Sequence, residues 1–247
     1  MECIATTESL DIFLEGTVFR CIVCTDYENS LLPRLAKNQP ELRQQLISLL
    51  ICPPHFTAVK NASLQNPAFL PAIRLLRLWA DSHLLSYAFP AILSEILLMV
   101  VMQESHALNP VVAFLRTLEL IITFPWRSDV FFADPTGSFT QQDKEAIEHE
   151  LEIVRSQPSE KRAIFVVSPY DRHSLLTSKT PDQASWSHVQ IVAQRTLRKI
   201  EADWLLLPDE TPIFTPRYSD FDVVITLNEA YLKPVPHGVR VAGGKIK

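Results

Sequence analysis

Glycine is scarce in this sequence. Five glycines stand among 247 residues, against 18 prolines, and only Gly16 and Gly137 occur before residue 238. A dinucleotide-binding loop, a Walker phosphate loop and the nucleophile elbow of α/β-hydrolases each need closely spaced glycines, because the backbone there turns sharply or approaches a phosphate. None of these motifs occurs in the sequence, so the enzymes that depend on them are excluded.

An excess of positive charge is also absent. The net charge at pH 7 is -5, so the chain as a whole has no attraction for nucleic acid or for an anionic membrane. The C-terminal tail is a local exception, with four basic residues and no acidic one: Lys233, Arg240, Lys245 and Lys247. Four cysteines and no recognisable signal peptide favour reduced thiols in the cytosol or nucleus.

The first half of the sequence predicts a helical bundle. Apolar residues make up 47% of the chain and charged residues 21%, which is typical of globular domains. After a predicted strand at residues 18–25, helices are expected at 40–51, 66–85, 90–103 and 109–124. Asn66-Pro67 and Asn109-Pro110 are start signals for two of these helices. Wide apolar faces and short connections indicate a bundle spanning about residues 30–125.

The second half follows a different pattern. Thr140 and Asp143 have the spacing of a capping box, and the helix they begin has an apolar stripe. Further on, buried strands are expected at 163–168 and 222–227, with a long helix at 184–204 between them. This order predicts a small α/β layer. We therefore expect two domains, 1–130 and 131–247.

Residues 84–102 form an apolar run with a single charge, and a hydropathy window marks it as a membrane span. Glu95 near its middle would be costly in lipid, and Pro90 lies inside the window. The central helix of a bundle explains the same run, so we expect no membrane association.

Cys21, Cys24, Cys52 and His55 are the right residue types for one tetrahedral zinc site. Against this, Cys21 and Cys24 fall in the predicted strand, where residues three apart point to opposite faces. Cysteine acting as a small apolar side chain is the commoner case. We expect no bound metal and no cofactor.

Asp220 and Asp222 have the aspartate-x-aspartate form that holds two magnesium ions in polymerase-type nucleotidyltransferases. Those enzymes also need a Gly-Ser turn about ten residues earlier. The only Gly-Ser, Gly137-Ser138, lies more than eighty residues upstream. The alternative, which we favour, is that Asp220 caps or turns the chain into a strand.

Arg195, Arg198 and Lys199 cluster on one side of the helix expected at 184–204. Together with the basic tail they are candidates for contact with RNA phosphates. The alternative is a solvated helix face, since Glu201 and Asp203 follow at once. Trp79 and His83, one helical turn apart, are interpreted as packing residues.

Several stretches in order resemble one known family. NPAFLPAIRLLRLWADSHLL (66–85), AFLRTLELIITFPWRSD (113–129) and the following FFADPTG resemble the penultimate domain of the nucleolar RNA-associated protein family, called Nrap. FVVSPYDRHSLLTSKTP (165–181) and FTPRYSDFDVVITL (214–227) resemble its final domain. FRCIVCTDYE (19–28) is similar to the strand that leads into the penultimate domain.

The resemblance implies an α+β fold. It consists of a helical bundle like the substrate-binding part of poly(A) polymerase and oligoadenylate synthetase, followed by a small nucleotidyltransferase-like α/β domain. It also implies a nucleolar component of the small-subunit processome, in which pre-ribosomal RNA is folded and cleaved. Such modules are thought to have lost catalysis, and the missing Gly-Ser turn agrees with this.

These observations predict a non-enzymatic scaffold of ribosome biogenesis in the nucleus and nucleolus. Its expected partners are small-subunit processome proteins and pre-rRNA, with no small-molecule substrate. One alternative is an active magnesium-dependent nucleotidyltransferase that uses Asp220 and Asp222. The other is a generic protein-binding module with no role in RNA.

Overall fold

The computed structural model describes most of the chain, in the segments 2–5, 9–22, 47–105, 108–134, 136–158, 160–177, 181–203, 212–216 and 218–220 and at residues 223 and 225. The backbone divides into two compact units. One unit is Leu50–Arg217, and the other combines Met1–Leu49 with Tyr218–Lys247.

The described part of the smaller unit contains an antiparallel sheet. Its three strands are, in spatial order, β1 (Glu2–Ala5), β2 (Ser9–Leu14) and β3 (Thr17–Ile22). Glu15 and Gly16 join β2 to β3 with φ angles of 47° and 83°. Two successive positive φ angles are characteristic of the hairpin turn whose twist matches that of the strands. The strand predicted at 18–25 is confirmed as far as Ile22, and its last three residues lie outside the described ones.

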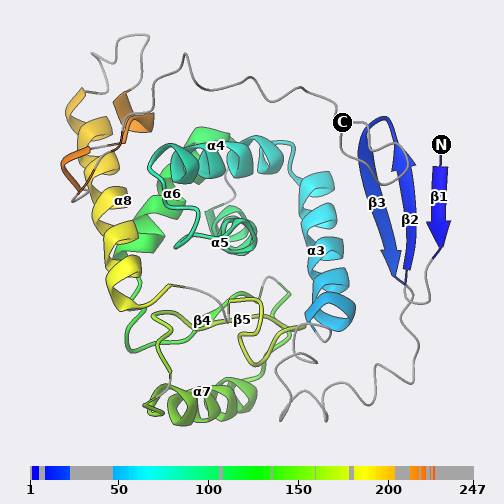
Figure 1. Cartoon of the computed structure of the whole chain (residues 1–247). Helices are drawn as coiled ribbons and strands as arrows, with labels where there is room; N and C mark the ends of the chain where they lie inside the picture. The colour runs from blue at the N-terminus through cyan, green and yellow to red at the C-terminus, as the bar shows by residue number, and fades with distance from the viewer. Residues whose placement is uncertain are drawn as a thin grey trace. The chain divides into compact units, whose positions relative to one another are not determined.

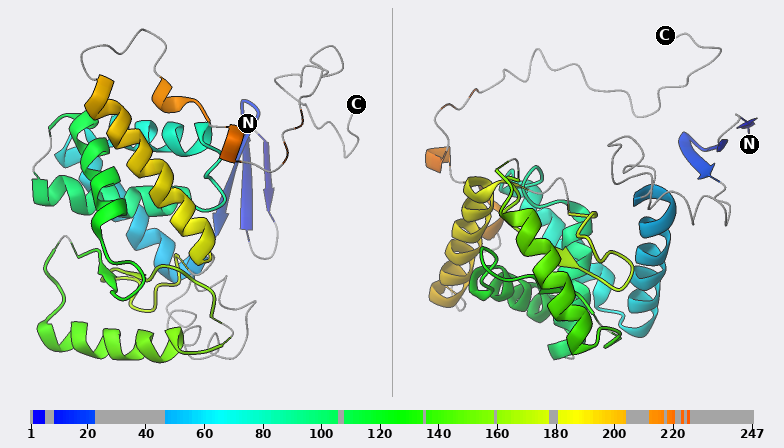
Figure 2. Two further views of the ribbon diagram at one scale, coloured as in Figure 1. Left: turned by 90° about the vertical axis from the view of Figure 1, so that its left-hand side faces the viewer. Right: turned by 90° about the horizontal axis from the view of Figure 1, so that it is seen from below.

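The larger unit contains the α-helices of the described residues. They are α3 (Cys52–Gln65), α4 (Phe69–Ser82), α5 (Ala91–Ser105), α6 (Pro110–Thr123), α7 (Gln141–Arg155) and α8 (Gln183–Asp203). Figure 1 shows α5 end-on, with α3, α4 and α6 around it, and α8 packs against α6 (Figures 1 and 2). The predicted bundle is therefore present.

The central helix α5 is buried on all sides. Every residue from Leu93 to Met102 is buried, including Ser94 and Glu95. A helix that is apolar around its whole circumference requires neighbours on every side, and α3, α4 and α6 supply them. Among the helices of the described residues, none is long and apolar enough to cross a membrane.

The start signals before α6 and α7 act as predicted. The Asn109 Oδ1 atom accepts a hydrogen bond of 2.8 Å from the Val111 amide, and Pro110 is the first helical residue of α6. At α7, Thr140 and Asp143 form a capping box in which each side chain binds the backbone N–H of the other residue. These reciprocal bonds satisfy donors that a helix start would otherwise leave unpaired.

Helix α3 was not predicted. The helix expected at 40–51 lies largely outside the described residues, and its last five, Ile47–Ile51, form one π-helical turn. Pro53 and Pro54 look like helix breakers in the sequence. They stand in the first turn of α3, where proline is tolerated because the missing N–H would have no partner within the helix.

The α/β layer keeps the helix predicted after Thr140 and part of the strand predicted at 163–168, but its other strand was not predicted. Strand β4 (Phe131–Phe132) pairs in parallel with β5 (Val166–Val167), and α7 connects them. Residues 163–168 are buried as expected, although only two of them form the strand. The buried strand predicted at 222–227 is wrong at its two described residues, since Val223 and Ile225 are outside any strand and are 74% and 79% exposed.

One hydrophobic core joins residues on both sides of position 130. The Trp126 ring lies 5.1 Å from that of Trp186 and 5.3 Å from that of Phe131, and Trp186 stacks on Phe89 at 6.2 Å. The structure therefore differs from the expected division into 1–130 and 131–247. Helix α8 packs on the bundle, and its buried face shares one core with residues of the bundle and of the small sheet, so residue 130 lies inside a compact unit.

Candidate functional site

Helix α8 carries the predicted RNA-contacting residues, and its start is fixed by a cap. The Asp182 Oδ1 atom accepts a hydrogen bond of 2.9 Å from the backbone N–H of Ser185. This bond and one from the Ser185 hydroxyl hold the pKa of Asp182 below its usual value. The ionised carboxylate also suits the positive end of the helix dipole.

The buried side of α8 fixes the rotation of the helix. The Trp79 Nε1–H group donates to Thr196 Oγ1 at 2.9 Å, and the Gln190 amide donates to the Ile121 carbonyl at 3.0 Å. Trp79 and His83 are packing residues as interpreted. Their rings lie 5.8 Å apart edge to face, and His83 Nε2 is 2.8 Å from the carbonyl of Ile213.

The opposite side of α8 presents the basic residues to solvent. Arg195, Arg198 and Lys199 are all exposed, and their spacing of three and four residues places them on one helix face. The structure thus brings these three candidates together. The four basic residues of the tail, Lys233, Arg240, Lys245 and Lys247, lie outside the described residues.

The paired aspartates do not have strand geometry at the residue that is described. Asp220 ends a short 3-10 turn, Tyr218–Asp220, and Asp222 lies outside the described residues. A turn at Asp220 agrees with the favoured interpretation, but the strand that this turn was expected to begin is absent at the described residues Val223 and Ile225. Among the described residues, no three His, Cys, Asp or Glu side chains are grouped as metal ligands would be.

The proposed zinc ligand His55 is already fully hydrogen-bonded. Its side chain is completely buried, with Nδ1 3.1 Å from the Tyr170 hydroxyl and Nε2 2.9 Å from Glu95 Oε2. A zinc ligand needs a free nitrogen lone pair, which this arrangement does not leave. Cys52 suits the alternative role of a small apolar side chain, since burial raises the pKa of its thiol and disfavours the thiolate that zinc would need. Cys24 lies outside the described residues.

His55 belongs to a polar cluster inside the helical unit that the sequence did not reveal. Glu95 is 9% exposed and accepts from His55 on one carboxylate oxygen and from Arg77 on the other. His55 comes from α3, Arg77 from α4 and Glu95 from α5. The loop after β5 supplies Tyr170, whose hydroxyl meets His55. We call His55, Arg77, Glu95 and Tyr170 the buried polar cluster.

Burial is the main cause of the raised pKa values in the loop that supplies Tyr170. It raises the pKa of Tyr170 to about 12, helped by the charges of Asp171 and Glu95. It also raises the pKa of Asp171, although this carboxylate accepts hydrogen bonds from two backbone amides. Both groups are held in the neutral form over a wider pH range than usual.

The buried polar cluster is suited to holding elements together. A buried glutamate with two hydrogen-bonded partners avoids the cost of an unpaired charge in the core. His55 has no exposed surface through which to reach a substrate. Glu95, the single charge in the apolar run 84–102, was the one sequence signal that a buried partner exists, but its partners are far away in the sequence.

Comparison with known families decides the assignment. Residues 66–216 match the family model described as "Nrap protein PAP/OAS1-like domain 5". The chain belongs to the Nrap family. This match confirms the resemblance and the α+β fold class. It also corrects one detail, because the single domain-5 match includes residues 165–181, which the resemblance assigned to the final domain.

The Nrap match extends to individual proteins over nearly the whole chain. Nucleolar protein 6 from Homo sapiens is 25% identical over 251 residues, covering 94% of the chain. The proteins of the same name from Mus musculus and Xenopus tropicalis are each 24% identical, over 94% and 92% of the chain. The chain spans about a fifth of the length of these relatives, 21% of each. Their name supports the predicted location of this Nrap chain in the nucleolus, within the nucleus.

Proposed function

We propose that this Nrap chain is a non-catalytic scaffold of the small-subunit processome. In this role it works in the nucleolus during pre-rRNA processing and ribosome biogenesis. It binds assembly proteins of the particle, and it contacts pre-rRNA through basic residues on its surface. The observation that carries the proposal is the domain-5 match over residues 66–216, together with nucleolar relatives that align over more than nine tenths of the chain.

The local structure at the Gly-Ser pair supports a non-catalytic role. In nucleotidyltransferases a Gly-Ser turn holds the triphosphate with its amides. Here Gly137 and Ser138 precede α7, and Asp134 accepts hydrogen bonds from the Ser138 amide at 2.9 Å and the Phe139 amide at 2.8 Å. A carboxylate already occupies the position that an anionic phosphate would need.

Co-sedimentation with pre-ribosomal particles tests the scaffold role. We expect the epitope-tagged chain to migrate with these particles in a gradient and its depletion to delay pre-rRNA processing. Trp186→Ala, which opens the core, should abolish co-migration, whereas the surface variant Glu119→Ala should retain it. Unchanged processing after depletion, with no particle association, would remove the proposal.

A polymerisation assay tests the catalytic alternative. We expect no incorporation when the chain is incubated with magnesium, nucleoside triphosphates and an RNA primer. Incorporation that disappears with Asp222→Ala but persists with the exposed control Asp129→Ala would show a nucleotidyltransferase and overturn the scaffold proposal.

A further inference from the structure

A pocket of about 450 Å³ lies beside the first turn of α8 in the larger unit. Four cations line it, Arg127, Arg155, Lys161 and Arg162, together with two carboxylates, Glu160 and Asp182. Both carboxylates have other partners, since Glu160 pairs with Arg162 at 2.8 Å and Asp182 caps α8. The lining therefore carries an excess of positive charge, and we call it the basic pocket.

Among the described residues, three of the four cations make no ion pair: Arg127, Arg155 and Lys161. Lys161 does lie near enough to Asp182 to contribute to the lowered pKa of that carboxyl. The Arg155 guanidinium is half-buried and donates to the carbonyl oxygens of Ser128 and Asp129. Asp129 and Glu152 lie near enough to favour its charge, but burial is the larger effect and lowers the pKa of Arg155. A half-buried guanidinium without a carboxylate is an unusual arrangement that a bound anion would stabilise.

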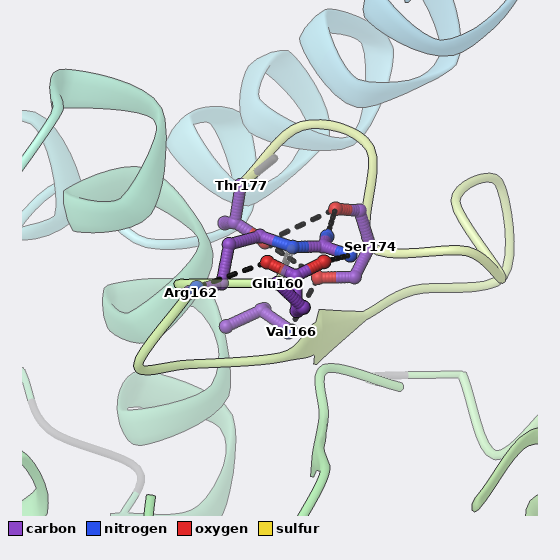
Figure 3. A network of polar contacts seen from close by, with 5 residues as sticks. All are labelled: Glu160, Arg162, Val166, Ser174 and Thr177. Atoms are coloured by element: carbon purple, nitrogen blue, oxygen red, sulfur yellow. Dashed lines mark hydrogen bonds and ion pairs between the residues drawn. The ribbon is translucent and has the colours of Figure 1, made fainter. Parts of the chain in front are cut away.

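The wall of the basic pocket is rigid. Figure 3 shows Arg162 between Glu160 and Ser174, with its Nη1 donating to the Ser174 carbonyl at 3.1 Å. The Ser174 hydroxyl accepts from the amide of Val166 in β5 and lies 2.6 Å from the Thr177 hydroxyl. Arg155 and Arg162 also stack on the ring of Phe165, at 4.9 Å and 4.5 Å from its centroid. The ring of Phe165 thus helps to hold both guanidinium groups in place.

The pocket continues into an exposed stripe of α8. Ala184 lines the pocket, and residues spaced alternately four and three apart follow it on the same face: His188, Ile191, Arg195 and Arg198. The stripe contains no acidic residue. With a rise of 1.5 Å per residue, Arg195 and Arg198 lie roughly 16–21 Å from Ala184 along the helix.

We propose that the basic pocket binds a backbone phosphate of single-stranded RNA, whose chain continues along this stripe to Arg195 and Arg198. Positive charge at two separated places requires a ligand with repeated negative charge. Between them, His188 and Ile191 offer surfaces on which unpaired bases stack. The proposal uses the four cations and not the helix N-terminus, whose amides Asp182 already caps. It rests on the proposed place of the chain beside pre-rRNA.

Fluorescence anisotropy with the full 247-residue chain tests this. The probe is a fluorescein-labelled, mixed-sequence single-stranded oligoribonucleotide of about 15 nucleotides. We expect the double variant Arg127→Ala/Lys161→Ala to bind the probe roughly 10- to 30-fold more weakly at about 0.1 M salt. The salt slope, meaning the steepness with which the logarithm of the binding constant falls with the logarithm of the salt concentration, should decrease by about 1.4, or about 0.7 for each lost phosphate contact. Arg127→Lys/Lys161→Arg, which keeps both charges, should bind like the wild type.

The matched control is Lys60→Ala/Arg74→Ala, which removes one lysine and one arginine exposed on α3 and α4. It should bind the probe within a factor of about two of the wild type. Wild-type affinity in the pocket variant would overturn the proposal. Tighter binding of a glutamate-rich peptide than of RNA would also overturn it, since the pocket would then serve an acidic protein. Particle co-sedimentation is measured separately, so failure of the scaffold role and failure of the pocket are distinguishable.

Discussion

Glu95 links three helices of the larger unit through its buried carboxylate. Its carboxylate is the common acceptor for His55 and Arg77, which come from two other helices. We expect Glu95→Ala to lower the free energy of unfolding by about 3–5 kcal/mol, because it leaves a buried imidazole and a guanidinium without their partner. Urea denaturation followed by circular dichroism measures this change.

The control for Glu95 is Glu119→Ala, which removes an exposed helical carboxylate from its pair with Arg116. Both substitutions replace a helical glutamate that pairs with arginine, so helix propensity cancels. The exposed pair should contribute less than about 1 kcal/mol. Equal effects of the two substitutions would mean that the buried polar cluster adds nothing to stability.

Tyr170 makes stability depend on alkaline pH. Its pKa in the folded protein is about 12, above the ordinary value of 10, so the folded protein keeps the proton where the unfolded chain loses it. The stabilisation is complete below pH 10 and is lost as the pH rises from 10 to 12, by up to about 2 kcal/mol after allowance for partial exposure. We expect Tyr170→Phe to remove this part of the alkaline loss.

Unfolding curves recorded at intervals from pH 8 to pH 12 check this expectation. Tyr87→Phe alters an exposed tyrosine and keeps Tyr170, so that variant should keep the alkaline loss of the wild type. If Tyr170→Phe follows the same pH curve as the wild type, the buried hydroxyl is not the source.

At the scale of single elements, α8 joins the core of the unit to its proposed RNA-binding surface. Its buried face is locked by Trp79 and Gln190, and this fixes where Arg195, Arg198 and Lys199 point. We expect the triple alanine variant of these three residues to reduce the salt slope of RNA binding by about 2, since each phosphate contact on a single strand contributes about 0.7. Anisotropy titrations at several salt concentrations measure the slope.

The matched control removes three exposed cations from other helices, as Lys60→Ala/Arg74→Ala/Arg116→Ala. Its salt slope should equal that of the wild type, because none of these three residues is among those proposed to meet phosphate. If the α8 variant and this control have the same slope, the basic residues of α8 are only a solvated helix face.

Elements with a local signal could be predicted from the sequence. The Asn109-Pro110 start and the Thr140/Asp143 box need only residues within one turn, and both occur as expected. Strand β4 has two residues, too few for any periodicity, and its pairing with β5 depends on a partner 35 residues away. The contacts of His55 with Glu95 and Tyr170 span 40 and 115 residues, so no local pattern could identify the buried polar cluster.

At the scale of the larger unit, the shared core sets how the chain can be divided. Trp126 contacts both Phe131 and Trp186, which lie on the other side of position 130. We expect the fragment Leu50–Arg217 to unfold in one cooperative urea transition, and fragments 50–130 and 131–217 to lack cooperative transitions because each loses part of this core. A sharp transition in fragment 50–130 alone would instead favour the division predicted from the sequence.

The aromatic core also gives the protein a built-in optical reporter. Trp79, Trp126 and Trp186 are all buried, and Trp126 and Trp186 are close enough for their rings to influence each other's near-ultraviolet signal. Trp79 belongs to α4, Trp126 to the segment that follows α6, and Trp186 to α8. Loosening of any one of these three elements should therefore change fluorescence and near-ultraviolet dichroism together. Ligand binding at the basic pocket, whose wall includes Arg127 next to Trp126, can therefore be followed without a label.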